Sequence, residues 1–258
     1  MDLRLTDRVA FIAGSSRGIG RAIARAFLGE GARVGIAGRQ ADSLAETTAS
    51  LEARFGTERI LACNADLTKT DEIATALGRT LERWNAIDCL VANIGSGIAK
   101  PGWELDQLEW DHVFETNVWS SVRLIEAVLP IMVRSGKGSI VLIASIAGLE
   151  SINAPLTYSA AKAALVNYGK NLARQVGASG VRVNCIAPGN VLFPGGSWEK
   201  KLAGRSEYFK RYIETEVPLQ RFGTPEEIAD LVVFLASERA SFITGACVVA
   251  DGGQTRSI

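Results

Sequence analysis

Tyr158 and Lys162 lie four residues apart in the helix-compatible stretch Tyr158-Ser159-Ala160-Ala161-Lys162. Residues at this spacing share one face of a helix, so the phenol and the ammonium group can point into the same space. A free phenol titrates near pH ~10, and a neighbouring positive charge lowers that pKa. The pair therefore predicts a proton donor for neutral solution, although the same spacing also occurs in surface pairs on ordinary helices.

A second group of residues, near the amino end, has the pattern of a phosphate-binding turn. The apolar stretch 8–13 is typical of a buried strand and is followed by Gly14-Ser15-Ser16-Arg17-Gly18-Ile19-Gly20 and an alanine-rich helical pattern. Glycines let the backbone approach a pyrophosphate, and the free amides at a helix start attract it. The spacing is GxxxGxG rather than GxGxxG, so the turn alone is a moderate signal for a dinucleotide.

Together these residues resemble the short-chain dehydrogenase/reductase family in its single-domain form. The family's catalytic tetrad of Asn, Ser, Tyr and Lys matches Asn117, Ser145, Tyr158 and Lys162. Further family motifs match in order along nearly the whole chain, at Asn64-Ala65-Asp66-Leu67, Ala92-Asn93-Ile94-Gly95, Pro188-Gly189 and Val249-Ala250-Asp251-Gly252-Gly253. The resemblance implies a nicotinamide-dependent oxidoreductase acting on CH–OH groups.

The alternation of apolar runs and helical patterns predicts an α/β fold. Strands are expected near 8–13, 33–37, 59–63, 87–92, 138–144, 181–187 and 246–250, with helices between them. This order predicts a doubly wound Rossmann fold, with a seven-stranded parallel sheet covered by helices on both faces. Ligands of such sheets bind beyond the carboxyl ends of the strands. The chain shows no linker or break in composition, so residues 1–258 are expected to form one domain.

Composition and charge exclude several classes of partner. The 28 basic and 28 acidic residues balance, which leaves no electrostatic footprint for nucleic acid. The sequence has no charged leader and no apolar run long enough to cross a bilayer, so a soluble, cytoplasmic protein without a membrane partner is expected. The single His112 and four scattered cysteines predict no metal site. Buried reduced thiols are expected at Cys63, Cys89, Cys185 and Cys247.

The residues after the second expected strand favour NADP(H) over NAD(H). An NAD site usually presents an acidic side chain there, whereas this chain has Gly38-Arg39, and Arg17 stands inside the glycine turn. Two guanidinium groups favour a 2′-phosphate through charge-assisted hydrogen bonds. The alternative is that Arg39 pairs with Asp42 while Arg17 faces solvent.

The family resemblance also implies the remaining contacts of the cofactor. Asp66 would meet the adenine ring, and Asn93 and Gly95 would line the adenosine ribose. The full set of expected cofactor residues is Gly14, Ser16, Arg17, Gly18, Ile19, Gly20, Arg39, Asp66, Leu67, Asn93, Gly95, Tyr158, Lys162, Pro188, Gly189 and Val191.

The tetrad has a defined chemical role under this resemblance. Tyr158 would donate a proton to a carbonyl oxygen as hydride leaves the nicotinamide, and Ser145 would orient that carbonyl. Lys162 would lower the pKa of Tyr158 and bind the nicotinamide ribose. Asn117, in a long helical pattern from Asp106 to Arg134, would hold a water that links Lys162 to solvent.

Three residues depart from the family pattern. Ala13 replaces a threonine before the glycine turn, Ile94 replaces a small alanine, and Phe193 replaces a threonine that often contacts the nicotinamide carboxamide. None removes a catalytic group, but Phe193 puts the geometry at the nicotinamide end in question.

The segment 190–217 is expected to form a lid over the substrate. It is rich in aromatic residues, at Phe193, Trp198, Tyr208, Phe209 and Tyr212. Such side chains suit an apolar or bulky substrate, although they could equally pack a helix pair against the domain or another subunit.

These features predict NADP(H)-dependent interconversion of a ketone and a secondary alcohol. The chain resembles 3-oxoacyl thioester reductases, so an acyl thioester is a candidate substrate. A sugar, polyol or hydroxy-acid dehydrogenase is the alternative with the same chemistry, and a non-catalytic NADP-binding sensor or scaffold is the alternative of another class. The resemblance also implies a homotetramer, paired through the helices that carry Asn117 and Tyr158.

Overall fold

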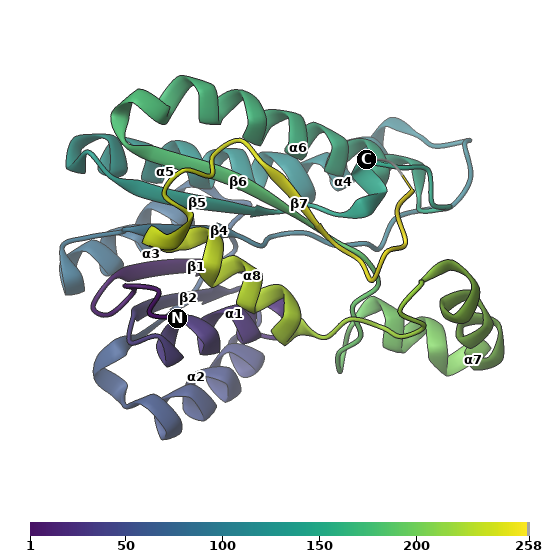
Figure 1. Ribbon diagram of the computed structural model, residues 1–258, viewed down its shortest axis with the longest axis horizontal. Coiled ribbons are helices and arrows are strands. Elements are labelled where there is room, and N and C mark those ends of the chain that lie inside the picture. The colour runs from purple at the N-terminus through teal and green to yellow at the C-terminus, as the bar shows by residue number, and fades with distance from the viewer. Residues whose placement is uncertain (257–258) are drawn as a thin grey trace.

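A parallel sheet of seven strands forms the centre of the computed structural model, which describes residues 1–256 apart from the side chains of residues 204–206 (Figure 1). The strands are β1 (Val9–Ala13), β2 (Arg33–Gly38), β3 (Ile60–Asn64), β4 (Cys89–Ala92), β5 (Gly138–Ile143), β6 (Val181–Pro188) and β7 (Cys247–Ala250). Their order in the sheet is β3-β2-β1-β4-β5-β6-β7, and each neighbouring pair is parallel. The predicted α/β fold, its strand number and its parallel sheet are confirmed.

Helices cover both faces of this sheet. They are α1 (Gly18–Gly29), α2 (Ala41–Phe55), α3 (Thr70–Trp84), α4 (Gln107–Phe114), α5 (Ser120–Ser135), α6 (Leu156–Val176), α7 (Ser197–Glu216) and α8 (Pro225–Ala236). Short 3-10 turns lie at Thr57–Arg59, Ile146–Gly148, Gly177–Ser179 and Glu238–Ala240. Apolar residues of α1, α2 and α8 pack on one face, and those of α3, α5 and α6 pack on the other. Helix α7 projects beyond the sheet as a separate arm (Figure 1).

The strands are apolar along their length because both faces of the sheet are covered. All five residues of β1 are buried, with Phe11 in the cluster under α3 and α5, and Ile12 in the cluster under α1 and α8. Burying one such side chain stabilises the fold by roughly 1.5–3 kcal/mol. No helix of the described chain is long and apolar enough to span a membrane.

The strand order creates one crevice at the carboxyl edge of the sheet. β1 lies between β2 and β4, so the chain runs outward in one direction from β1 to β3 and in the other from β4 to β7. The loops after β1 and β4 therefore diverge, which leaves a depression between them. All the catalytic and cofactor residues expected from the sequence follow strands that end at this edge, apart from the helical Asn117, Tyr158 and Lys162.

The expected long helix from Asp106 to Arg134 is interrupted. Helix α4 ends at Phe114, a π-helical turn spans Glu115–Trp119, and α5 begins at Ser120. Arg123 reaches back to bond the Glu115 carboxylate and so holds the two sides of this turn together. A helical periodicity cannot reveal one extra residue in a turn, and π turns are frequent at functional sites.

Candidate active site

The glycine turn brings the end of β1 against the start of α1. Gly14 and Gly18 have φ values of +64° and +54°, a left-handed backbone that favours glycine. A side chain at Gly20 would lie 2.7 Å from Asn93 Nδ2, so the helix could not approach the end of β4 with any larger residue. The residue before α1 makes no side-chain cap to the helix, which leaves the first amides available to a pyrophosphate.

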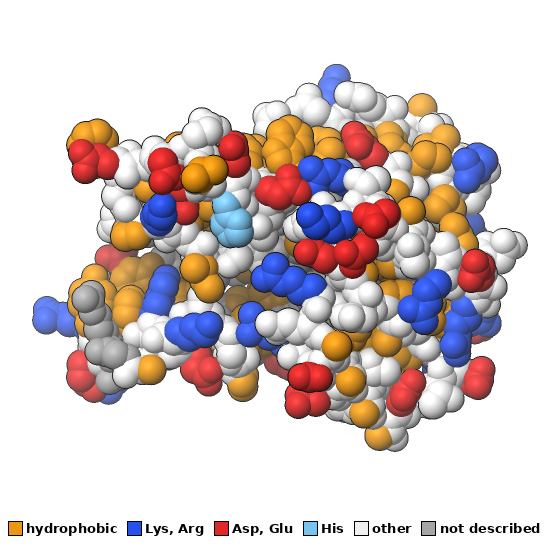
Figure 2. Space-filling view, turned by 180° about the vertical axis from the view of Figure 1, so that it is seen from behind, with side chains coloured by type: hydrophobic (Ala, Val, Ile, Leu, Met, Phe, Trp, Pro, Cys, Tyr) orange, Lys and Arg blue, Asp and Glu red, His pale blue; other side chains and the backbone are white. Residues whose placement is uncertain are grey.

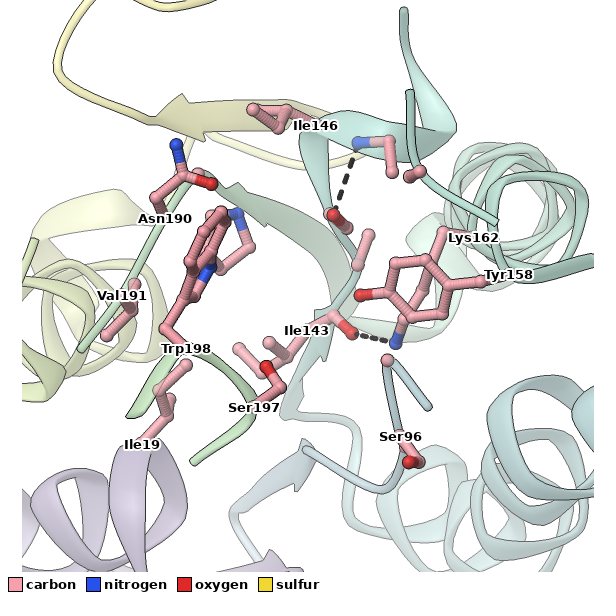
Figure 3. Close-up of a pocket in the computed structure, with 18 of the residues that line it drawn as sticks. Ile19, Ser96, Ile143, Ile146, Tyr158, Lys162, Asn190, Val191, Ser197 and Trp198 are labelled. Atoms are coloured by element: carbon pink, nitrogen blue, oxygen red, sulfur yellow. Dashed lines mark hydrogen bonds between the residues drawn. The ribbon is translucent and has the colours of Figure 1, made fainter. Parts of the chain in front are cut away.

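Ser145, Tyr158 and Lys162 meet at the end of β5. Ser145 precedes the 3-10 turn Ile146–Gly148, and its Oγ accepts a hydrogen bond of 3.2 Å from the Ala147 amide. A side chain at Gly148 would stand 2.6 Å from backbone atoms of Lys162 and Ala163, so only glycine lets this turn press against α6. That close packing sets Ser145 beside Tyr158, whose hydroxyl points into the pocket in Figure 3.

Burial is the main cause of the pKa shifts of Tyr158 and Lys162. Burial raises the pKa of Tyr158 above its ordinary value, and a hydrogen bond with Ser145 acts in the opposite direction. Burial also lowers the pKa of Lys162, to about 8. The Lys162 ammonium donates to the Ile143 carbonyl at 2.9 Å and lies 5.9 Å from the centre of the Tyr158 ring. Burial is thus the largest influence on the pKa of Tyr158 in this structure, and the lowering of that pKa by Lys162 stays a prediction.

Asn117 lies in the π-helical turn, behind the end of β4. Its side chain is buried and bonded on both sides, because Oδ1 accepts from the Ser96 amide at 3.1 Å and Nδ2 donates to the Val113 carbonyl at 3.0 Å. A side chain at Gly95 would stand 2.7 Å from Asn117 Oδ1 and 3.1 Å from Lys162 Nζ. Asn117 thus fixes the backbone next to Lys162, and the water assigned to it from the resemblance stays a prediction.

The two arginines lie at the adenosine end of the crevice in different environments. The Arg17 guanidinium donates to the Gly195 carbonyl at 2.9 Å, so it does not simply face solvent. Arg39 is exposed, and the structure shows no ion pair between Arg39 and Asp42 in the described chain. Burial disfavours the Asp66 carboxylate, but two hydrogen bonds from Thr68 and the charge of Arg39 hold the pKa of Asp66 below its ordinary value.

One crevice of about 950 Å³ contains nearly every residue expected from the sequence. It is lined by Gly14, Ser16, Arg17, Ile19, Arg39, Asp66, Leu67, Asn93, Gly95, Ser145, Tyr158, Lys162, Pro188, Gly189 and Val191. Gly18, Gly20 and Asn117 lie just behind this lining, where they shape the backbone. Figure 2 shows the crevice as a hollow between the body and α7, with hydrophobic side chains in its depth and basic side chains at its rim.

The segment after β6 forms one wall of this crevice, as expected for 190–217, but most of it is the helix α7. Trp198 contacts Phe209, Tyr212 and Phe222 with ring centres 5.3–6.0 Å apart. Lys201 lies 4.4 Å above the Trp198 ring. The indole stands across the pocket from Tyr158 (Figure 3). The aromatic residues therefore pack on one another and also face the crevice, and the lid expected at 190–217 stays a prediction.

Phe193, which stands where the family often has a threonine, packs its ring against the glycine turn. A side chain at Gly18 would lie 2.7 and 2.8 Å from two carbons of the Phe193 ring, so the ring rests on the glycine turn. With the Arg17–Gly195 hydrogen bond, this packing joins the start of the segment 190–217 to the glycine turn.

Sequence reasoning missed the polar contacts that connect the segment 190–217 to the rest of the crevice, and of their residues it named only Tyr212, for its aromatic ring. Asn190, Tyr212 and Gln254 form a hydrogen-bonded chain, and Glu150 accepts from the Arg256 amide. These residues lie on four separate segments and carry no recognisable spacing. Only the position of Gln254, directly after the family motif that ends at Gly253, pointed to this edge of the sheet.

Known proteins share both the sequence and the fold. The model of a family described as Enoyl-(Acyl carrier protein) reductase matches residues 13–255. A 3-oxoacyl-[acyl-carrier-protein] reductase of Chlamydia muridarum is 36% identical over 253 residues, which cover 98% of this chain and 99% of that protein. A dehydrogenase/reductase SDR family member 4 of Oryctolagus cuniculus is 35% identical, over 96% of this chain and 94% of that protein. The chain belongs to the short-chain dehydrogenase/reductase family.

Solved structures of this family agree closely with the fold. L-sorbose reductase of Gluconobacter frateurii, complexed with NADPH and L-sorbose, has a TM-score of 0.94 and 34% identity, with all of both chains covered. A 7 alpha-hydroxysteroid dehydrogenase complexed with NADH has a TM-score of 0.91 and 29% identity, over 99% of this chain and 97% of that one. The protein is therefore an oxidoreductase of the short-chain family, whose crevice suits a nicotinamide dinucleotide.

The cysteines do not take part in this site. Cys63, Cys89 and Cys185 are buried, Cys247 is half-buried, and all four are free thiols. Burial raises the pKa of Cys89 and Cys185 to about 12, so both stay protonated in neutral solution. Within residues 1–256 no three histidine, cysteine, aspartate or glutamate side chains gather as a metal site.

Proposed function

We propose that the protein uses NADP(H) to interconvert a ketone and a secondary alcohol. One observation carries this proposal: Ser145, Tyr158 and Lys162 line the same crevice as the glycine turn and Arg39. A dinucleotide with its pyrophosphate at the start of α1 can reach both groups, because the crevice runs along the carboxyl ends of the strands.

Each residue of the tetrad has a separate task in this reaction. NADPH, when bound, supplies the hydride. Tyr158 Oη donates a proton to the carbonyl oxygen, and Ser145 Oγ lies beside it to orient that oxygen and stabilise its developing charge. Lys162 places a positive charge beneath the phenol, and Asn117 fixes the backbone next to Lys162.

The choice of NADP(H) rests on Arg17 and Arg39. Both side chains line the adenosine end of the crevice, where β2 ends in Gly38 and no acidic residue follows. Arg39 is exposed and can turn toward a 2′-phosphate, while Arg17 has further N–H groups beyond the one that bonds Gly195.

Two substrate classes fit this chemistry. Similarity to 3-oxoacyl-[acyl-carrier-protein] reductases favours an acyl thioester, and the basic rim of the crevice suits the phosphate of a pantetheine arm. Similarity to L-sorbose reductase favours a sugar or polyol, and the polar chain of Asn190, Gln254 and Tyr212 supports hydroxyl recognition. We propose a 3-oxoacyl thioester as the first candidate.

We also propose a cytoplasmic homotetramer. The expected pairing uses the helices around Asn117 and Tyr158, and large apolar side chains are exposed there. They are Leu108 on α4, Trp119 beside α5 and Leu156 on α6, which are between 49% and 77% exposed. Apolar side chains gathered on neighbouring helices favour association with another copy. Measurement of the mass in solution tests this assembly.

An absorbance assay of NADPH tests the activity. Wild-type protein is incubated with 3-oxoacyl thioesters, polyhydroxy ketones and simple ketones, and an enoyl thioester serves as the comparison for reduction of a carbon–carbon double bond. The proposal predicts oxidation of NADPH with at least one ketone. Tyr158→Phe should abolish it while NADPH affinity stays within a few-fold. Tight binding of NADPH without turnover of any ketone would instead support a sensor or scaffold.

A further inference from the structure

The C-terminal segment 251–256, here called the strap, turns back over the crevice. It follows β7, and Gly252 and Gly253 adopt φ values of +69° and +87° to reverse its direction. The Asp251 carboxylate holds this turn by accepting from the amides of Gly253 at 2.8 Å and Thr255 at 2.7 Å. The strap is therefore an ordered turn that is stabilised by its own hydrogen bonds.

One side of the strap is bound to the lid. Gln254 is buried, its Oε1 accepts from Asn190 Nδ2 at 2.7 Å, and its Nε2 donates to Tyr212 Oη at 2.7 Å. The Tyr212 ring in turn stacks on Trp198 with an interplanar angle of 20°. Gln254 is thus connected, through Tyr212, to the indole that stands opposite Tyr158.

The other side of the strap is bound to the opposite wall. The Arg256 amide donates to both carboxylate oxygens of Glu150, at 2.9 and 3.1 Å, and Glu150 lies in the loop between β5 and α6. The guanidinium of the same residue pairs at 3.4 Å with Glu216, back on the side of the lid at the end of α7. Figure 1 shows this yellow segment running from the lid side toward the start of α6. The strap therefore joins the two walls of the crevice.

Gln254 and Arg256 line the same crevice as Tyr158. The crevice has a volume of about 950 Å³, near the upper end of the ~300–1,000 Å³ that is usual for one ligand. Here it must hold a dinucleotide and a substrate together. A long substrate needs additional space, and the strap lines the crevice where it connects the segment 190–217 with Glu150.

We propose that the strap sets the size limit of the substrate, so that compact ketones and short 3-oxoacyl chains are accepted and long chains are excluded. Gln254 is the specificity-determining residue, because it holds both the strap and, through Tyr212, the indole of Trp198. This inference rests on the proposed reduction of ketones.

Kinetics on a series of substrates test the strap. The series consists of methyl ketones and 3-oxoacyl N-acetylcysteamine thioesters of increasing chain length, and kcat/KM is measured for each with saturating NADPH. For the wild type, kcat/KM falls as the chain grows. Gln254→Ala should raise the ratio of long-chain to short-chain kcat/KM by about tenfold or more, since a single methylene in a pocket is worth ~10–200-fold.

Three further variants separate the strap from general damage. Tyr212→Phe removes one hydrogen bond of Gln254 but keeps the ring, and should shift the ratio by less than Gln254→Ala does. Gln254→Met keeps the volume and loses both bonds, and it replaces the alanine variant if that protein does not fold. Arg25→Met breaks an ion pair of 2.7 Å between α1 and α8, outside the crevice, and should leave the ratio unchanged.

Two results would overturn the inference. One is a wild type that turns over long and short chains equally well. The other is an unchanged ratio in folded Gln254→Ala or Gln254→Met protein. If none of the tested ketones supports oxidation of NADPH by the wild type, the proposed function fails. The role of the strap is then tested by calorimetry, as the ratio of long-chain to short-chain affinity for the NADP⁺ complex in the wild type and in the Gln254 variants.

Discussion

Gly18→Ala tests whether the start of the lid rests on the glycine turn. The φ of +54° at Gly18 belongs to the left-handed region, which costs an alanine about 1–2 kcal/mol. The new Cβ would also lie 2.7 Å from the Phe193 Cζ, whereas unstrained carbon contacts are about 3.5–4.0 Å. The ring must withdraw by roughly 1 Å, and such overpacking costs about 1–3 kcal/mol more. The expected loss of unfolding free energy is therefore about 2–5 kcal/mol.

A double-mutant cycle with Phe193→Ala isolates the contact. Phe193 is half-buried, so its truncation alone should cost less than the ~3–5 kcal/mol of a fully buried phenylalanine. In the double variant the ring is absent and only the cost of the left-handed backbone remains. The combined loss should thus be smaller than the sum of the single losses by about 1–3 kcal/mol.

Urea unfolding of the four proteins measures these differences, provided that the denaturant slope is unchanged. Gly78→Ala is the matched control, because Gly78 lies within α3 and a side chain there meets no atom within 4 Å. That change should stabilise the protein by about 0.5–1 kcal/mol. Strict additivity of Gly18→Ala and Phe193→Ala would refute the contact between ring and turn.

Three other predictions concern cofactor, pH and substrate. Arg39→Asp should weaken NADPH by about 10–100-fold, the value of one hydrogen bond to a charged group, and leave NADH nearly unaffected; equal loss for both cofactors in calorimetry would reject the role of Arg39. The pKa of Lys162 near 8 predicts that kcat/KM for NADPH falls as the pH rises through about 8, where the ammonium loses its proton. Lys162→Arg should remove that alkaline limb, and a limb that persists must come from another group. Trp198→Ala should lower kcat/KM for the ketone by about tenfold without changing NADPH affinity, whereas a loss of ~3–5 kcal/mol of stability with normal kinetics would make Trp198 a core residue.

The sequence was sufficient for the elements that depend on local pattern. Strand β1 is a run of five apolar residues, and the glycine turn after it leads into a helical pattern, an order that indicates a strand-turn-helix unit. The pairing of Tyr158 with Lys162 follows from helical periodicity in the same way. For that reason the strands and the crevice at their carboxyl ends could be predicted from local pattern, whereas Asn117 and Ser145 were assigned only by the family resemblance.

Contacts between distant segments could not be predicted in this way. The Arg17–Gly195 hydrogen bond joins residues 178 positions apart, and Arg256 meets Glu150 across 106 positions. The direction in which the pKa of Tyr158 shifts on folding could not be predicted for a related reason. Its direction depends on how far the phenol is desolvated, and burial is a property of the assembled chain.

The strand order also assigns three regions of the crevice to three successive parts of the chain. Residues after β1, β2 and β3 line one end of the crevice, residues from β4 to α6 include the four expected catalytic residues, and residues after β6 and β7 include the proposed lid and the strap. Selection can therefore change the substrate by altering the last quarter of the chain, without disturbing the inherited chemistry. This modular arrangement explains how relatives at about one-third identity reduce a thioester in one case and a sugar in another.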